Sequence, residues 1–146
     1  MHTSSNPDAA YVRLITTAFH AFTSHDVEAF LKLVDPEIEL RAPTAERARG
    51  GSPYVGSDGI RQYFEDVARI WRELRLIPQL YGRRDNMLVV TGRVYARDAD
   101  GLTDSPAAWL VEEREGRIGR LRVYTNRHEA LEAASLSADE LKPIFA

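Results

Sequence analysis

The chain has 146 residues, of which 44% are hydrophobic and 28% are charged, and its formal net charge is −3. This length and composition predict one globular domain with a single core rather than a disordered chain. The acidic balance argues against a nucleic-acid surface, which needs clustered positive charge, and the lack of cysteine excludes disulfides and thiolate metal sites.

Membrane and secretory features are missing from the sequence. There is no run of about 18 apolar residues to span a bilayer. The start of the chain has no basic region followed by an apolar one, so we expect no secretory signal. Absence of cysteine fits a reducing compartment, and we expect a cytoplasmic protein. The histidines lack metal-ligand spacing, so we expect no metal and no cofactor.

The first half of the chain is predicted to be mainly helical. From Asp8, apolar residues recur at helical spacing and form one buried stripe: Tyr11, Leu14, Ile15, Ala18, Phe19 and Phe22. Ser24 or Asp26 is expected to cap a second, short helix that ends before Pro36. Residues 37–42 alternate as a short strand. Residues 43–53 are polar and contain glycine, so they are expected to form a loop over the mouth of a pocket.

A third helix follows, and then the period changes to two. Ser57 or Asp58 is expected to cap the helix, whose inward stripe is Ile60, Phe64, Val67, Ile70, Trp71 and Leu74. Strands are predicted at 76–81, 87–97, 107–113 and 117–126, with turns at 82–86, 98–104 and 114–116. Short polar turns indicate antiparallel hairpins. A short helix is expected at 129–134, and residues 137–145 are expected to pack at an edge.

Helices first and strands afterwards predict an α+β fold in which a curved antiparallel sheet wraps around the N-terminal helices. Such a sheet, closed on one side by helices, forms a cone-shaped pocket whose open end can hold a small ligand. The expected partners are therefore a small molecule and a second copy of the chain, and neither nucleic acid nor a membrane.

Several motifs, in this order, resemble those of the nuclear transport factor 2-like superfamily and, within it, the SnoaL-like group. They are Asp26–Phe30, Asp35–Leu40, Tyr54–Phe64, the turn Gly116–Ile118 and Tyr124–Glu132. The resemblance covers residues 8–135, leaving 1–7 as an N-terminal tail and 136–146 as a C-terminal tail. It implies a nuclear transport factor 2-like (cystatin-like) α+β cone. It also implies a homodimer through the outer sheet face, where Arg120, Arg122 and Tyr124 are expected.

The reactions known in this superfamily need side chains that this sequence lacks. The resemblance places the general-base aspartate of the steroid isomerases at Ala42 and their oxyanion-donating tyrosine near Ala18. The Asp–Arg–Asp arrangement of the epoxide hydrolases falls on Arg93, Tyr95 and Val123, and the aspartate of the SnoaL-type cyclases also falls on Val123. An isopropyl group cannot transfer a proton, so these reactions are argued against.

Strand parity gives a candidate pocket. It places Val89, Thr91, Arg93 and Tyr95 on one face of the strand at 87–97. Trp109, Val111 and Glu113 share a face of the strand at 107–113, and Leu121, Val123 and Thr125 share a face of the strand at 117–126. The expected ligand contacts are Arg93, Tyr95, Trp109, Tyr63, Trp71, Leu121 and Val123. Such a pocket is mostly apolar, with Arg93 and Tyr95 as its polar groups. It would suit a flat or aliphatic molecule bearing a carboxylate, enolate or carbonyl.

Structural roles remain alternatives for the same residues. Arg93 can instead form an ion pair on the outer face, while Tyr63 and Trp71 are also spaced for packing of a helix on the sheet. Two function classes stay open: a small-molecule binder without the usual catalytic acids, which we favour, and a cyclase, isomerase, dehydratase or epoxide hydrolase with an unusual acid or base. Candidates for that acid or base are Tyr95, Glu113 and Asp104. A dimeric interaction module is a third possibility.

Overall fold

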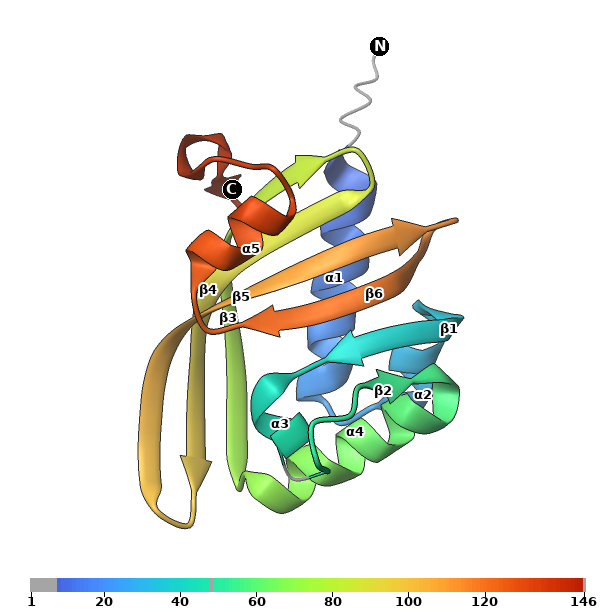
Figure 1. The fold of residues 1–146 in the computed structure, drawn as a ribbon, viewed down its shortest axis with the longest axis vertical. Coiled ribbons are helices and arrows are strands. Elements are labelled where there is room, and N and C mark those ends of the chain that lie inside the picture. Colours follow the sequence, from blue (N-terminus) through green and yellow to red (C-terminus); the bar gives the residue numbers. More distant parts are fainter. Residues whose placement is uncertain (1–7, 48, 146) are drawn as a thin grey trace.

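The computed structural model describes residues 8–47 and 49–145, and within them the chain forms one curved, unclosed sheet with helices on its concave side (Figure 1). The strand order is β2-β1-β6-β5-β4-β3-β7. The strands are β1 Val34–Arg41, β2 Tyr54–Val55, β3 Glu73–Arg84, β4 Met87–Asp98, β5 Gly101–Arg114, β6 Arg117–Tyr124 and β7 Lys142–Pro143. The helices are α1 Asp8–Thr23, α2 Val27–Leu31, α3 Pro43–Arg47, α4 Gly56–Ile70 and α5 Arg127–Ala133, with a 3-10 turn, η1, at Ala138–Glu140. The predicted α+β fold is confirmed.

Two helices cover opposite faces of the sheet. The apolar stripe of α1 packs with Val90, Trp109 and Val111 in the main core, as its periodicity predicted. The short helix α5 packs on the other face over Val89 and Ala108, and Figure 1 shows it in front of the strands with α1 behind them. The outer face of the sheet is therefore partly covered by the chain itself.

The entry into α4 differs from the prediction. Neither Ser57 nor Asp58 caps the helix, because it begins at Gly56 and its N-cap Val55 makes no side-chain hydrogen bond. Val55 pairs with Glu39 of β1, so the turn into the helix falls on Gly56, whose φ of 72° suits a residue without a Cβ. The helix ends at Ile70, so Trp71 lies in extended backbone and Leu74 belongs to β3.

Three predicted connections also contain regular structure. The expected turn at 82–86 is wrong for residues 82–84, because β3 continues to Arg84 and these residues pair with β4. The expected loop after β1 includes the one-turn helix α3, which has Pro43 at its first position. The expected turn at 98–104 is wrong beyond Asp100, because β5 begins at Gly101 and residues 101–104 pair with the end of β4. The hairpins β3–β4, β4–β5 and β5–β6 are antiparallel as predicted, whereas β1 pairs with β6 in parallel. Residues 142–143 pair with β3 at the sheet edge.

Candidate functional site

An inner cavity of about 130 Å³ lies between the concave face of the sheet and the helices. Four strands supply its wall, β3 through Leu74 and Leu76 and three others: Trp109 of β5 pairs directly with Val123 of β6, and Val94 of β4 pairs with Ser105 of β5. Tyr63 of α4 and the residues Trp71, Leu74 and Leu76 complete the wall, and residues 42–45 at α3 bound one end. We call this space, with its deeper extension, the inner cavity.

The deeper extension is narrow, and only Tyr63 and Trp109 among its lining residues carry a polar side-chain atom. It has a volume of about 20 Å³ and shares Tyr63, Leu76, Trp109 and Val123 with the wider part. Its floor consists of Ile15, Ala18, Phe19, Phe22, Phe30 and Leu121. Phe19 meets Trp109 edge-on with ring centroids 4.9 Å apart, which fixes the indole between the two parts.

The polar groups along the inner cavity are neutral. Within the described residues, no Asp, Glu, His, Lys or Arg lines either part. The polar side-chain groups of the lining residues are the hydroxyls of Tyr63, Tyr124, Thr44, Ser105 and Thr125 and the indole N–H groups of Trp71 and Trp109. None of these groups has a hydrogen-bond partner among the described residues. They are therefore available to a bound molecule.

Tyr63 holds a defined position in this wall. Its ring stacks on Phe22 with centroids 5.6 Å apart and meets Tyr54 edge-on at 5.2 Å. Burial, and then the neighbouring Tyr54, raise the pKa of the Tyr63 phenol well above its ordinary value. The hydroxyl therefore stays protonated and can donate a hydrogen bond throughout the physiological pH range.

A buried carboxylate, Asp66, is linked to this wall through the Tyr54 ring, which contacts Tyr63. Asp66 of α4 is 2% exposed and accepts hydrogen bonds from the Tyr54 hydroxyl (2.7 Å), Gln62 Nε2 (2.8 Å) and Arg69 Nη2 (2.5 Å). Burial alone would raise the pKa of Asp66, but the hydrogen bonds from Tyr54 and Gln62 and the charge of Arg69 together lower it. This network fixes Tyr54 and, through the ring contact, Tyr63.

A second buried carboxylate, Glu46, holds the helix α3 in place at one end of the inner cavity. Glu46 is 4% exposed, accepts a hydrogen bond from the Ala42 amide and forms an ion pair of 2.9 Å with Arg41 of β1. The Glu46 carboxylate raises the pKa of the Arg41 guanidinium through this hydrogen bond. Glu46 thereby couples the position of α3 to the end of β1.

Part of the predicted ligand-contact set comes together here. Trp109, Tyr63, Trp71 and Val123 line the wider part of the inner cavity, and Leu121 lines the deeper part. Whether these residues bind a ligand stays a prediction. Val94, Leu76 and Ser105 also line the cavity and were not predicted. The alternation of Arg93, Tyr95 and Arg97 along β4 was a usable signal for Val94, because it indicates which face of the strand is polar. Two arginines on one strand face indicate the solvent side.

The other polar candidates lie elsewhere. Arg93 and Tyr95 face away from the inner cavity, because they flank Val94 on β4 and Val94 lines the cavity. Trp109, which also lines the cavity, pairs with Val90 and not with Val89. Arg93 forms an ion pair of 2.8 Å with Asp104, and the two side chains are 42% and 56% exposed. The predicted parity of β4 relative to Trp109 was therefore wrong by one residue. Val89, which was grouped with Arg93 and Tyr95, is buried, but under α5 on the outer face.

Glu113 also lies outside the inner cavity. A register shift between Glu112 and Glu113 ends the regular alternation of β5, and the Glu113 carboxylate accepts a hydrogen bond of 2.7 Å from the Gly116 amide in the turn. No group of three or more His, Asp or Glu residues that could hold a metal ion occurs in the described part of the chain. Among the described helices, none is long and apolar enough to cross a membrane.

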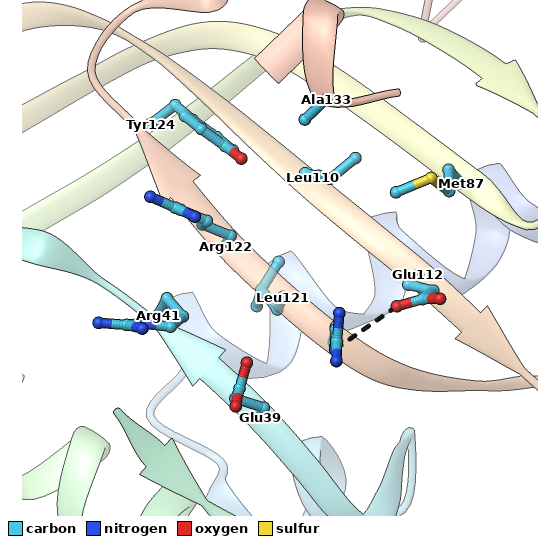
Figure 2. Close-up of a pocket in the computed structure, with 10 residues that line it drawn as sticks. Glu39, Arg41, Met87, Leu110, Glu112, Leu121, Arg122, Tyr124 and Ala133 are labelled. Carbon is cyan, nitrogen blue, oxygen red and sulfur yellow. Dashed lines mark ion pairs between the residues drawn. The ribbon is translucent and has the colours of Figure 1, made fainter. Parts of the chain in front are cut away.

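A second hollow, of about 300 Å³, lies on the outer face of the sheet (Figure 2). We call it the outer groove. Arg120, Arg122 and Tyr124 line it, as expected for the outer face, and Tyr124 also borders the inner cavity. Its remaining lining residues are Glu39, Arg41, Met87, Leu110, Glu112, Leu121 and Ala133. Formation of a homodimer through this face stays a prediction.

Comparison with known proteins identifies the family. The model of the SnoaL-like domain matches residues 15–121. The chain belongs to the SnoaL-like family. Among curated proteins, none matches the sequence.

Solved structures similar to this SnoaL-like chain share its fold. A nuclear transport factor 2-like protein of unknown function from Burkholderia pseudomallei superposes with a TM-score of 0.73 at 17% identity, covering 87% of this chain and 98% of the other. TerC, co-crystallised with polyporic acid, gives 0.73 at 21% identity, with 85% and 99% covered. A proposed polyketide cyclase from Xanthomonas campestris pv. campestris gives 0.70 at 19% identity, with 86% and 96% covered.

Membership of the SnoaL-like family does not by itself assign a reaction, because one fold supports many functions. Three positions to which the family resemblance assigned catalytic groups do line the inner cavity: Ala18, Ala42 and Val123. In this chain all three are aliphatic. The three positions where the resemblance places catalytic groups therefore carry no ionisable side chain in this chain.

Proposed function

We propose that the inner cavity binds a small, uncharged molecule that has an apolar body and a hydrogen-bond acceptor. The observation that carries this proposal is the set of neutral donors without partners in an otherwise apolar space. A carbonyl or ether oxygen would satisfy the Tyr63 hydroxyl or an indole N–H without bringing a charge into the cavity. A carboxylate would lose its hydration there and meet no cation.

The size of the inner cavity limits the ligand. An apolar cavity of about 150 Å³ is known to hold benzene, and the wider part of the inner cavity is close to that volume, at about 130 Å³. The expected ligand is therefore a single ring or a short branched chain. Co-crystallisation of TerC, which has the same fold, with polyporic acid supports a small organic molecule as the class of ligand.

The enzyme alternative has less support. The candidate acids and bases Tyr95, Glu113 and Asp104 are not among the residues that line the inner cavity. Tyr63 is ionisable, but its raised pKa makes it a hydrogen-bond donor rather than a base at neutral pH. Similarity to a proposed polyketide cyclase concerns the fold and supplies none of the missing groups. Binding is therefore the function we propose.

The test uses three probes of similar shape: acetophenone, ethylbenzene and benzoate. Both tryptophans of the chain line the inner cavity, so their indole N–H signals in NMR spectra report binding there directly. We expect acetophenone to shift both signals and to bind more tightly than ethylbenzene, with benzoate weakest. In Tyr63→Phe the advantage of acetophenone over ethylbenzene should fall by about 2- to 10-fold, the value of one neutral hydrogen bond.

Tyr95→Phe is the matched control, because it removes the same hydroxyl from the outer side of β4 and should leave all three affinities unchanged. Equal binding of acetophenone and ethylbenzene to the wild type, or equal effects of the two variants, would refute the role of the neutral donors. No indole shift with any probe would refute binding in the inner cavity.

A further inference from the structure

We propose that the outer groove is a second binding site, specific for an organic monoanion: a carboxylate carried on an apolar body. This site is separate from the inner cavity, because Arg122 and Val123 are consecutive residues of β6 and their side chains point to opposite faces of the sheet. Its ligand differs in charge from the one proposed for the inner cavity.

The pairing of two arginines is the first reason. Arg41 of β1 is in register with Arg122 of β6, and Figure 2 shows their side chains on neighbouring strands at the same end of the groove. Like charges directly opposite each other on adjacent strands are destabilising. An anion placed between the two guanidinium groups would relieve this repulsion.

The second reason is that one of the arginines lacks a carboxylate partner. Arg41 is paired with Glu46 at 2.9 Å and Arg120 with Glu112 at 3.7 Å. Within the described part of the chain, Arg122 forms no ion pair, and its contact is with the Tyr124 ring at 4.9 Å. A guanidinium stacked on an aromatic ring keeps its N–H edge free for a bidentate bond to a carboxylate.

The remaining lining sets the class of anion. Met87, Leu110 and Ala133 supply an apolar surface away from Arg41 and Arg122, as Figure 2 shows. Glu39 and Glu112 also line the groove, and their charges disfavour a second negative group on the ligand. The volume of about 300 Å³ lies at the lower end of the range for small-molecule sites. One carboxylate with an apolar tail fits these features together.

The experiment compares hexanoate with its neutral counterpart hexanamide, by calorimetry and by NMR. We expect hexanoate to bind weakly, with a Kd that rises with salt because Arg120 and Arg122 are exposed. Hexanamide should bind at least about 10-fold more weakly, since it lacks the charge-assisted bond. The indole signals of Trp71 and Trp109 should not shift with hexanoate, which separates this site from the inner cavity.

Arg122→Gln should weaken hexanoate binding by about 10-fold or more. The matched control is Arg75→Gln, an arginine that is 67% exposed on β3 and is not part of the groove, which should leave hexanoate affinity unchanged. Both variants should bind acetophenone as the wild type does. Failure of the inner-cavity proposal would therefore not affect this result.

Four outcomes would overturn the proposal: no binding of hexanoate, equal binding of hexanamide, equal effects of the two substitutions, or a hexanoate-induced shift of the indole signals. Sedimentation of the wild type and Arg122→Gln gives a further check. If the wild type is a dimer that Arg122→Gln dissociates, a second copy occupies the groove and the ligand site is refuted.

Discussion

The inner and outer sides of the sheet hold their polar groups in opposite ways. The inner cavity is lined by neutral hydroxyl and indole groups, and the charge behind its wall, Asp66, is buried and accepts three hydrogen bonds. On the outer face, charges are exposed and paired across strands, as in Arg93–Asp104 and Arg120–Glu112.

The difference follows from solvation. A carboxylate removed from water must be fully hydrogen-bonded to remain charged, whereas an ion pair in water is screened and contributes little. Charge on the inner side is therefore expected to support the structure, and neutral donors are expected to meet the ligand. On the outer side single ion pairs are expected to be dispensable.

The largest effect is expected on the inner side, for Asp66→Ala. This change removes three hydrogen bonds to a buried charge and leaves the Tyr54 hydroxyl, deep in the core, without its acceptor. We expect the free energy of unfolding to fall by about 2–4 kcal/mol. Urea denaturation measures it, and loss of the fixed Tyr54 ring should also weaken acetophenone binding through Tyr63.

Glu65→Ala is the control for this change. Glu65 is the neighbouring acid on α4, but it is exposed, and its removal should alter stability by no more than about 0.5 kcal/mol. If the two substitutions prove equally mild, the buried network does not support the inner wall and the contrast between the two sides fails.

A smaller effect is expected from acid. The pKa of Asp66 is lower in the folded protein than in the unfolded chain, where it is about 3.9, so the unfolded state binds more protons in that range. The stabilisation from Asp66 is therefore fully present above about pH 4 and is lost as the pH falls through the folded-state pKa. Asp8, whose pKa the hydrogen bond from Arg83 lowers, adds to the same trend.

The measurement is the urea midpoint from pH 6 down to pH 2, for the wild type and Asp66→Asn. We expect the variant to be less stable at pH 6 but to lose stability less steeply below pH 4, because one titrating group is gone. Parallel curves would show that the Asp66 carboxylate does not titrate differently in the folded and unfolded states.

The fold was largely predictable because its elements have strong periodic signals. The helical stripe through Ile15 and Phe19 and the hairpins after residue 76 depend on local spacing, and the structure confirms them. The parallel pairing of β1 with β6 was not predicted, because it joins strands about 80 residues apart and has no local signal. The role of Glu46 was not predicted either, because its hydrogen bonds with Arg41 and Ala42 form only when α3 brings its carboxylate back to the end of β1.

The candidate site was predictable in its location but not in its polar groups. Trp109 and Val123 were assigned to one pocket because both are large or apolar and lie on paired strands, and they do line the inner cavity. Arg93 and Tyr95 were assigned to the pocket face together with Val89, and sequence alone does not reveal that α5 buries Val89 on the outer face. A strand covered on both faces loses the alternation on which such assignments depend.

The smallest effect is expected on the outer side, for the Arg93–Asp104 pair. A double-mutant cycle of Arg93→Ala and Asp104→Ala should give a coupling of about 0.2–1 kcal/mol, which falls with added salt because both side chains are in contact with water. Neither variant should change the affinity for acetophenone or the indole signals, because both residues lie on the face away from the inner cavity.

A coupling that exceeds this range and resists salt would mean that the pair is covered in solution, as by a second copy of the chain. Loss of acetophenone binding in Arg93→Ala would instead restore Arg93 as a ligand contact, and the separation of neutral inner donors from charged outer pairs would no longer hold.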